Sequence, residues 1–313
     1  MYIGIDIGGT NIKLGVVDSS GDIIYIHSFK TDVSAGPLAN LEQIKNSIYK
    51  MITQFPAVQS IGIGAPGIFD NSGGLCVSPN LQNWHGINIQ NELKKDFNLT
   101  IAVDNDANAA AVAEMELGAG KELSDFIYTT LGTGIGGCIV FGRKIFRGST
   151  GAAGEIGHTI INYDSIKKDI PSYRQGIMEE LAGRKAIITN YQLLITNDDF
   201  GRSISSNFDV EDIANFANEG NESAIKCIED TGKIIGIGLA SAMNLLDIHV
   251  AIVGGGISQS GDILYDSIRK TIKEHSLPTI SESFEVKEAF FKNNTGIIGA
   301  AMLGLNKLKE KSQ

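Results

Sequence analysis

The feature that most constrains this chain is a pattern that occurs twice. Residues 2–17 consist of an apolar strand, a glycine turn at residues 6–10 and a second apolar strand, and residues 126–141 begin the same pattern around a glycine turn at 131–134. Two copies of one strand-turn-strand unit indicate a chain with two similar halves. Such halves would face each other across a cleft, where ligand sites preferentially form.

Length and periodicity predict a two-domain α/β protein. A chain of 313 residues exceeds what one hydrophobic core usually serves. Runs of β-branched residues alternate with amphipathic segments, as in α/β proteins. We expect the boundary in the connector near residues 117–124, with one domain over 1–118 and a second over 119–296. The C-terminal helix, 297–313, is expected to return to the first domain.

The same periodicities predict individual elements. Strands are expected at Tyr2–Ile7, Ile12–Asp18, Ile23–Phe29, Ser60–Gly64, Thr100–Val103, Phe126–Leu131, Cys138–Phe141, Thr159–Ile161, Ile248–Val253 and Ser283–Glu288. Helices are expected at Pro37–Phe55, Asn88–Phe97, Ala107–Leu117, Met178–Leu194, Val210–Phe216, Glu222–Leu246, Ile263–Lys273 and Ile297–Leu308.

Composition excludes several classes of function. A net charge of -10 and an isoelectric point near 5.0 argue against a nucleic-acid surface, which normally carries a basic patch. Cys76, Cys138 and Cys227 are too scattered for a disulfide framework or a zinc cage, which fits a reducing cytoplasm. No secretory signal is visible at the N-terminus. The most apolar region, Ile234–Val253, contains polar residues that disfavour a membrane span.

The first glycine turn is typical of a phosphate site. Gly8 and Gly9 leave room for a ligand and can adopt positive φ, so that successive N–H groups converge on an anion. Asp6 could hold Mg²⁺ through water, and Lys13 could add local positive charge. The alternative is an ordinary hairpin whose turn requires glycine.

Two further glycine clusters support the phosphate interpretation. The turn 132–134 could present amides and the Thr133 hydroxyl to another face of a polyphosphate, or could be a simple tight turn. Residues 254–256 are three glycines between an apolar strand and a predicted helix, where the backbone could approach a nucleoside. They match neither a Walker loop nor a dinucleotide fingerprint.

Residues 104–108 place two carboxylates and two amides between an apolar strand and an alanine-rich helix. This is the position at which α/β proteins bind ligands. The competing interpretation is helix capping, because Asp and Asn are favoured N-cap residues. One cap serves one helix, whereas four polar residues occur here.

Three other segments suit a sugar pocket. Glu155 and His158 lie in a loop of small residues and could bind a polyol, although His158 could also be a structural histidine bonded to backbone. No neighbouring cysteine or second histidine completes a zinc site there. Gly67 and the segment 79–84, which includes Asn80, offer a rigid loop and amides, or turn chemistry alone.

Taken together, these motifs resemble the ROK family (repressor, open reading frame, kinase) over nearly the whole chain. The resemblance implies two actin-like, ribonuclease H-like α/β domains around an interdomain cleft. It implies a catalytic base at Asp106. It implies sugar contacts at Gly67, Asn80, Asn105, Glu155, His158 and Glu179. It implies nucleotide and phosphate contacts at Asp6, Gly8, Gly9, Thr10, Asn11, Lys13, Gly132, Thr133, Gly134, Gly254, Gly255 and Gly256, with Asp6 also at the metal.

The chain departs from the family pattern in two respects. Many members carry a cysteine-rich zinc motif between the positions of His158 and Glu179, whereas residues 160–178 contain no cysteine here. We therefore expect no structural zinc and a direct contact of His158 with sugar. The chain also begins directly at the phosphate strand, whereas the family's repressors have an N-terminal helix-turn-helix domain, which disfavours a repressor.

The sequence thus predicts an ATP- and Mg²⁺-dependent hexose kinase, most simply a glucokinase that phosphorylates the 6-hydroxyl of glucose with Asp106 as base. Kinases for N-acetylmannosamine, N-acetylglucosamine, fructose or allose share these motifs. A non-catalytic sugar-binding regulator is the competing class, and an actin-like filament protein is disfavoured. We expect a cytoplasmic homodimer that acts in glycolysis or other carbohydrate metabolism and binds neither nucleic acid nor membrane.

Overall fold

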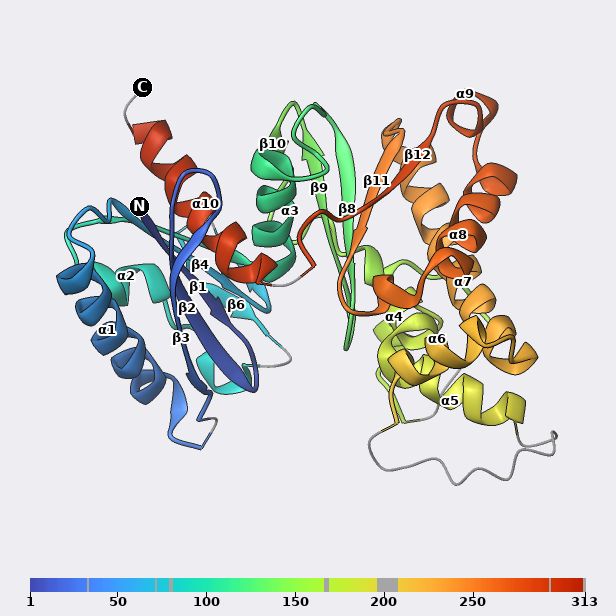
Figure 1. The fold of residues 1–313 in the computed structure, drawn as a ribbon, viewed down its shortest axis with the longest axis horizontal. Helices are drawn as coiled ribbons and strands as arrows, with labels where there is room; N and C mark the ends of the chain where they lie inside the picture. Colours follow the sequence, from blue (N-terminus) through green and yellow to red (C-terminus); the bar gives the residue numbers. More distant parts are fainter. Residues whose placement is uncertain are drawn as a thin grey trace. The chain divides into compact units, whose positions relative to one another are not determined.

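The computed structural model describes residues 1–32, 34–70, 72–78, 81–165, 169–195, 208–292 and 294–311, and is drawn in Figure 1. The chain divides into two compact units. Unit 1 comprises Met1–Leu123, Arg143–Ala153 and Phe290–Gln313. Unit 2 comprises Ser124–Gly142 and Gly154–Ala289. The sequence placed the boundary after residue 118 and assigned the whole of 119–296 to the second domain, whereas 119–123, 143–153 and 290–296 lie in unit 1.

Unit 1 is built on a five-stranded mixed sheet in the order β3-β2-β1-β4-β7. The first three strands are antiparallel neighbours, whereas β1, β4 and β7 are parallel. The strands are β1 (Tyr2–Ile7), β2 (Asn11–Val17), β3 (Ile23–Lys30), β4 (Ser60–Ala65) and β7 (Thr100–Asn105). The remaining elements of the unit are α1 (Gly36–Gln54), β5 (Ile68–Phe69), β6 (Leu75–Val77), η1 (Gln82–Trp84), α2 (Ile89–Lys94), α3 (Asp106–Leu117), β10 (Lys144–Ile145) and α10 (Thr295–Lys311).

Helices cover both faces of this sheet. Apolar residues of α1 and α2 share one buried cluster with residues of β1, β2 and β4. On the other face α10 contacts β1, β4 and α3 (Figure 1). This contact is backbone against backbone, since a Cβ atom at Gly62 would lie 1.6 Å from the carbonyl oxygen of Ala300. A helix can approach a sheet this closely only over glycine.

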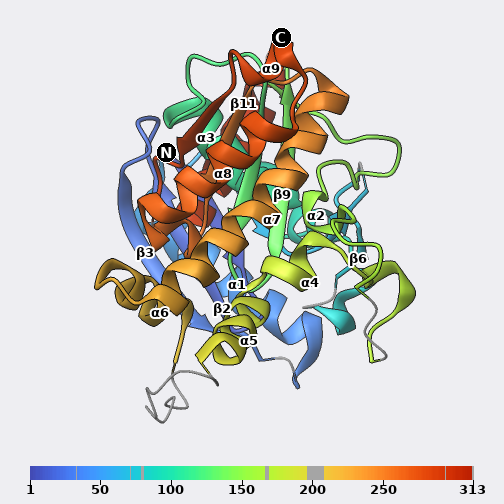
Figure 2. The ribbon, with the colours of Figure 1, turned by 90° about the vertical axis from the view of Figure 1, so that its right-hand side faces the viewer.

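Unit 2 has strands in the order β9-β8-β11-β12. The β8–β9 pair is an antiparallel hairpin, and β11 is parallel to both β8 and β12. Helices α7 and α8 run side by side in both views (Figures 1 and 2). The elements are β8 (Phe126–Leu131), β9 (Ile135–Phe141), η2 (Ile156–His158), η3 (Ser172–Arg174), α4 (Met178–Ala182), α5 (Arg184–Ile195), α6 (Val210–Asn218), α7 (Glu222–Leu246), β11 (Val250–Gly254), η4 (Ile257–Ser260), α8 (Asp262–His275), α9 (Pro278–Ser281) and β12 (Glu285–Glu288).

Two predicted elements of unit 2 differ from the structure in kind, and others differ only in where they begin or end. The single helix expected over 178–194 is two helices, because the chain is extended at Gly183 between α4 and α5. The strand expected over 159–161 is one isolated bridge between Ile160 and Ile177. Within the described residues, no helix is both long and apolar enough to cross a membrane.

Candidate active site

The first glycine turn closes the β1–β2 hairpin. The Gly8 N–H donates to the Asn11 carbonyl at 2.9 Å. Neither Gly8 nor Gly9 uses the left-handed conformation that glycine allows. Glycine is required at position 8 for a different reason: a Cβ atom there would lie 2.8 Å from the Asn11 carbonyl oxygen. Thr10 is exposed with Gly9 and Asn11, so the turn is accessible to a ligand.

Asp6 lies just before this turn, paired in the ladder with Lys13. Burial and then the negative charge of Asp106 raise the pKa of Asp6 from 3.8 to about 6, while Lys13 opposes the shift. Asp6 and Asp106, 100 positions apart in the sequence, therefore share one site. Gly296, at the start of α10, packs closely against the Asp6 carboxylate. A Cβ atom at position 296 would lie 2.5 Å from the Asp6 carboxyl carbon.

Asn105 and Gly67, two of the predicted sugar residues, are joined by a hydrogen bond. The Asn105 side-chain oxygen caps α3 by accepting from the Ala107 and Asn108 N–H groups at 2.8 and 3.3 Å. Its amide nitrogen donates to the Gly67 carbonyl at 3.0 Å. The helix-capping interpretation is thus correct for Asn105, and the same side chain also connects Gly67 to the start of α3.

Asp104 has a structural function in the same segment. Its buried carboxylate accepts hydrogen bonds from the Asn105 N–H and the Asn108 amide, both at 2.8 Å. It also forms an ion pair with Arg147 at 2.5 Å. The sequence pattern groups Asp104 with the other polar residues of this segment and gives no sign of its partner Arg147. These contacts assign Asp104 to holding the β7–α3 junction.

Asp106 is the first residue of α3, and its side chain is exposed. One carboxylate oxygen accepts from the Ala107 N–H at 2.9 Å. Desolvation by the surrounding protein raises the pKa of Asp106, and backbone hydrogen bonds, including that of Ala107, oppose the shift. A helix N-terminus favours negative charge. Asp106 is thus an accessible acid that a substrate hydroxyl can reach.

The second glycine turn closes the β8–β9 hairpin. The Gly132 N–H donates to the Gly134 carbonyl at 2.9 Å, and the Arg184 N–H at the start of α5 donates to the Gly132 carbonyl at 3.2 Å. Glu179 contacts this turn, because its Oε2 accepts from the Ile135 N–H at 2.8 Å. A Cβ atom at Gly134 would lie 2.2 Å from that oxygen, which accounts for glycine at this position.

The three glycines that follow β11 have different functions. Gly254 packs closely, since a Cβ atom there would lie 2.8 Å from the Tyr128 hydroxyl. Gly255 is left-handed with φ +91°, and a Cβ atom there would lie 2.3 Å from the Leu131 carbonyl. Gly256 faces open space and starts η4. Only Gly256 of the three lines the pocket described next.

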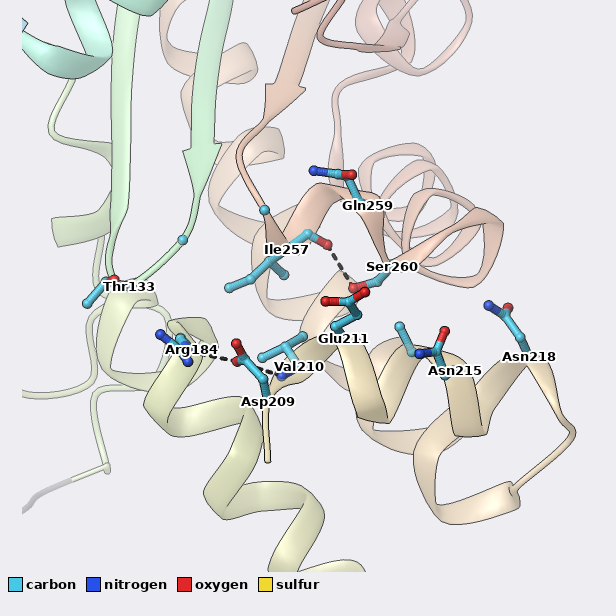
Figure 3. Close-up of a pocket in the computed structure, with 13 residues that line it drawn as sticks. Thr133, Arg184, Asp209, Val210, Glu211, Asn215, Asn218, Ile257, Gln259 and Ser260 are labelled. Carbon is cyan, nitrogen blue, oxygen red and sulfur yellow. Dashed lines mark hydrogen bonds and ion pairs between the residues drawn. The ribbon is translucent and has the colours of Figure 1, made fainter. Parts of the chain in front are cut away.

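A pocket of about 450 Å³ lies within unit 2 (Figure 3). The second glycine turn, the start of α5, helix α6 and η4 surround it. Its lining residues are Gly132, Thr133, Arg184, Asp209, Val210, Glu211, Ala214, Asn215, Asn218, Gly256, Ile257, Gln259 and Ser260. The predicted nucleotide residues Gly132, Thr133 and Gly256 therefore meet at one cavity, whereas Gly134, Gly254 and Gly255 are not among its lining residues.

Arg184 and Asp209 are functional candidates that sequence analysis missed. Arg184 Nε and Asp209 Oδ1 are 2.7 Å apart at the pocket (Figure 3). Asp209 also caps α6 in a capping box with Asp212. The spacing of these two acids before an apolar run could have identified the cap. The pairing with Arg184 could not be found from sequence, because the two residues are 25 positions apart.

The predicted sugar loop lies in unit 2 from Gly154 onward. Glu155 and His158 are exposed on either side of Ile156 and Gly157, with the His158 N–H donating to the Glu155 carbonyl at 3.0 Å. Asn80 lies outside the described residues. In the part of the chain that the structure describes, no three His, Cys, Asp or Glu side chains are grouped as metal ligands.

The two mixed sheets and their glycine turns define an α/β protein of the actin-like ATPase fold, the fold of solved ROK sugar kinases. A sequence model described as the ROK family matches residues 2–307. The chain therefore belongs to the ROK family.

Relatives within the family differ in activity. A glucokinase from Streptomyces coelicolor is 32% identical over 316 residues, which cover 97% of each chain. A xylose repressor from Caldicellulosiruptor bescii is 29% identical over 307 residues, covering 95% of this chain and 76% of the repressor. The crystal structure of a ROK family glucokinase from Streptomyces griseus with glucose and AMPPNP has a TM-score of 0.79 and 30% identity, covering 97% of this chain and 99% of that chain.

Proposed function

We propose that this protein is an ATP-dependent hexose kinase, and specifically a glucokinase that phosphorylates the 6-hydroxyl of glucose. The observation that carries the proposal is the accessible carboxylate of Asp106 at the N-terminus of α3, beside Asp6. The Streptomyces griseus relative, solved with glucose and an ATP analogue, supports the choice of substrates. A binding protein would need no acid of this kind.

Asp106 would act as the general base. Its carboxylate would accept the proton of the sugar hydroxyl as that oxygen attacks the γ-phosphorus of ATP, while the bond from this phosphorus to the β,γ-bridging oxygen breaks and ADP leaves. Asn105 and Gly67 would position the sugar, because their mutual hydrogen bond holds the segment after β4 against the start of α3. Glu155, His158, Asn80 and Glu179 complete the proposed sugar contacts.

The nucleotide would bind in the pocket of unit 2, with phosphates toward Gly132 and Thr133 and the nucleoside toward Gly256 and α6. Backbone N–H groups of a glycine turn suit an anion. The proposed phosphate contacts of the first turn are Gly8, Gly9, Thr10, Asn11 and Lys13.

The acids of unit 1 fit a magnesium ion. The charge of Asp106 raises the pKa of Asp6, so a cation beside Asp6 would relieve this cost, and oxygen is the ligand that Mg²⁺ prefers. Asp6 would hold the ion, directly or through water. When bound, Mg²⁺ supplies charge neutralisation for the phosphates of ATP.

The similarity to a xylose repressor favours a second candidate, a sugar-binding regulator without catalysis. Asp106 and the unit 2 pocket argue for the kinase, because a regulator requires neither. Family membership also supports kinases for N-acetylmannosamine, N-acetylglucosamine, fructose or allose. We further infer a homodimer in the cytoplasm, acting in glycolysis or other carbohydrate metabolism.

A coupled assay of ADP release against a panel of hexoses tests the proposal. The wild-type protein should give its highest kcat/KM with glucose, and Asp106→Asn should lower kcat by about 100- to 10,000-fold, the usual contribution of a positioned base. Nucleotide affinity should change little. Asp266→Asn, which alters an exposed carboxylate of α8, is the matched control. No activity with any sugar, or full activity of Asp106→Asn, would contradict the assignment.

A further inference from the structure

Glu179 has an environment that the sugar-contact assignment does not explain. Its Oε2 accepts from the Ile135 N–H at 2.8 Å, at the end of the turn that carries Thr133. Its Oε1 accepts from Arg174 Nη2 at 2.6 Å. The carboxylate therefore connects the segment before α4 with the second glycine turn.

Arg174 divides its guanidinium between two neighbouring acids. Nη2 lies 2.6 Å from Glu179 Oε1 and 2.7 Å from Glu180 Oε1, and Nε donates to Glu180 Oε1 at 2.8 Å. The three side chains expose only 20–23% of their surface. Partly buried, charge-assisted hydrogen bonds of this length are stronger than surface ion pairs. Of the two acids, the one that the structure bonds to the turn is Glu179.

The backbone around Arg174 is held in place. The two arms of its loop pair through the Ile161 N–H and the Gly176 carbonyl at 2.8 Å, and through the Met178 N–H and the Thr159 carbonyl at 2.9 Å. Arg174 closes η3 between these arms. The contact at the turn is equally close, because any side chain at Gly134 would occupy the position of the Glu179 carboxylate.

We propose that Arg174 is a positioning residue, which holds the Glu179 carboxylate against the second glycine turn. It thereby links the segment before α4, where a sugar contact is proposed at Glu179, to the turn where a phosphate contact is proposed at Thr133. The binding of sugar at Glu179 and the binding of phosphate at Thr133 would then affect each other through this one carboxylate. The proposal rests on the proposed function for its kinetic consequences, but its structural part does not.

The chain supplies a matched pair of variants. Glu179→Gln and Glu180→Gln each remove one charged partner of the same arginine, and only the first disturbs the turn. Arg174→Ala removes both ion pairs. Arg174→Lys keeps a cation without the planar fork and should give an intermediate result.

Hydrogen exchange of the Ile135 amide measures the strength of its hydrogen bond to Glu179 and does not depend on kinase activity. We expect exchange to accelerate by about tenfold in Arg174→Ala, the effect of losing one charge-assisted hydrogen bond. Glu180→Gln should stay within about twofold of wild type, because Arg174 and Glu179 remain. In the kinase assay, Arg174→Ala and Glu179→Gln should raise KM for the hexose by about tenfold while changing kcat much less.

The outcomes separate this inference from the proposed function. If Ile135 exchanges in Arg174→Ala as it does in wild type, or if Glu180→Gln matches Glu179→Gln, Arg174 only stabilises its loop and the inference is wrong. If wild-type protein phosphorylates no hexose, the proposed function fails and the exchange experiment still decides the role of Arg174. If Arg174→Ala does not fold, Arg174→Lys decides it, because Ile135 exchange as slow as in wild type in that variant would contradict the inference.

Discussion

Asp6→Asn is expected to stabilise the protein at neutral pH. Burial and the charge of Asp106 raise the pKa of Asp6 from 3.8 to about 6, so ionised Asp6 costs folding free energy. At about 1.36 kcal/mol per pKa unit, this difference corresponds to about 3 kcal/mol. For a unit of this size, that is about 6–12 °C in the melting temperature.

The pH dependence follows from the direction of the shift. Below pH 3.8 the carboxyl is protonated in the folded and the unfolded states, so the variant gains nothing. Between 3.8 and about 6 the unfolded chain loses its proton first, and wild-type stability falls as the pH rises. Above pH 6 the difference between Asp6→Asn and wild type should reach its full size.

Thermal unfolding in EDTA from pH 4 to pH 8 measures this difference without bound metal. Asp104→Asn is the matched control, because that buried carboxylate is compensated by Arg147 and two hydrogen bonds. It should destabilise the protein, because the amide keeps one oxygen for the two donors on Oδ1 but presents an NH₂ group to Arg147 in place of the carboxylate oxygen. The reasoning is refuted if Asp6→Asn melts no higher than wild type at pH 7.5, or if its gain is the same at pH 4.

Two further predictions concern unit 2 and the cysteines. Arg184→Ala should raise KM for ATP by about fivefold with little change in kcat, because a half-exposed cation is worth about 1 kcal/mol; Lys185→Ala is the control, and equal effects of the two would show only a loss of net charge. Burial raises the pKa of Cys227 to about 12, so its thiol stays neutral and unreactive at pH 8. Titration of native protein with a thiol reagent should therefore label the exposed Cys76 rapidly and the buried Cys138 and Cys227 slowly, and a fast phase that survives Cys76→Ser would contradict this.

Sequence predicted those features that depend on neighbours along the chain. The strands 2–7 and 126–131 and the helix 222–246 have the expected bounds, because alternation or helical spacing is complete within each segment. Asn105 as a helix cap also follows from a local preference. The break between α4 and α5 was missed because apolar periodicity continues across Gly183, and the extended backbone at that glycine carries no periodic signal.

The site could be predicted in its parts but not in its contacts. The sequence predicts phosphate sites at the glycine turns, which stays a prediction, but it does not show that Glu179 fills the space beside Gly134 from 44 positions further along. The ion pair between Asp104 and Arg147 joins residues 43 positions apart. Such pairings depend on how separate elements pack, and no spacing rule encodes them.

The buried and partly buried carboxylates of unit 1 differ in how fully the protein compensates their negative charge. Buried Glu114 accepts hydrogen bonds from the backbone N–H groups of Ala119, Phe290 and Phe291. Asp104, equally buried, is balanced by an arginine and two donors. Asp6 differs, because burial and a neighbouring acid outweigh Lys13 and raise its pKa. A carboxylate whose burial cost exceeds its compensation within the unit is expected where an external cation completes the charge balance, and Asp6 lies beside the acid proposed as the base.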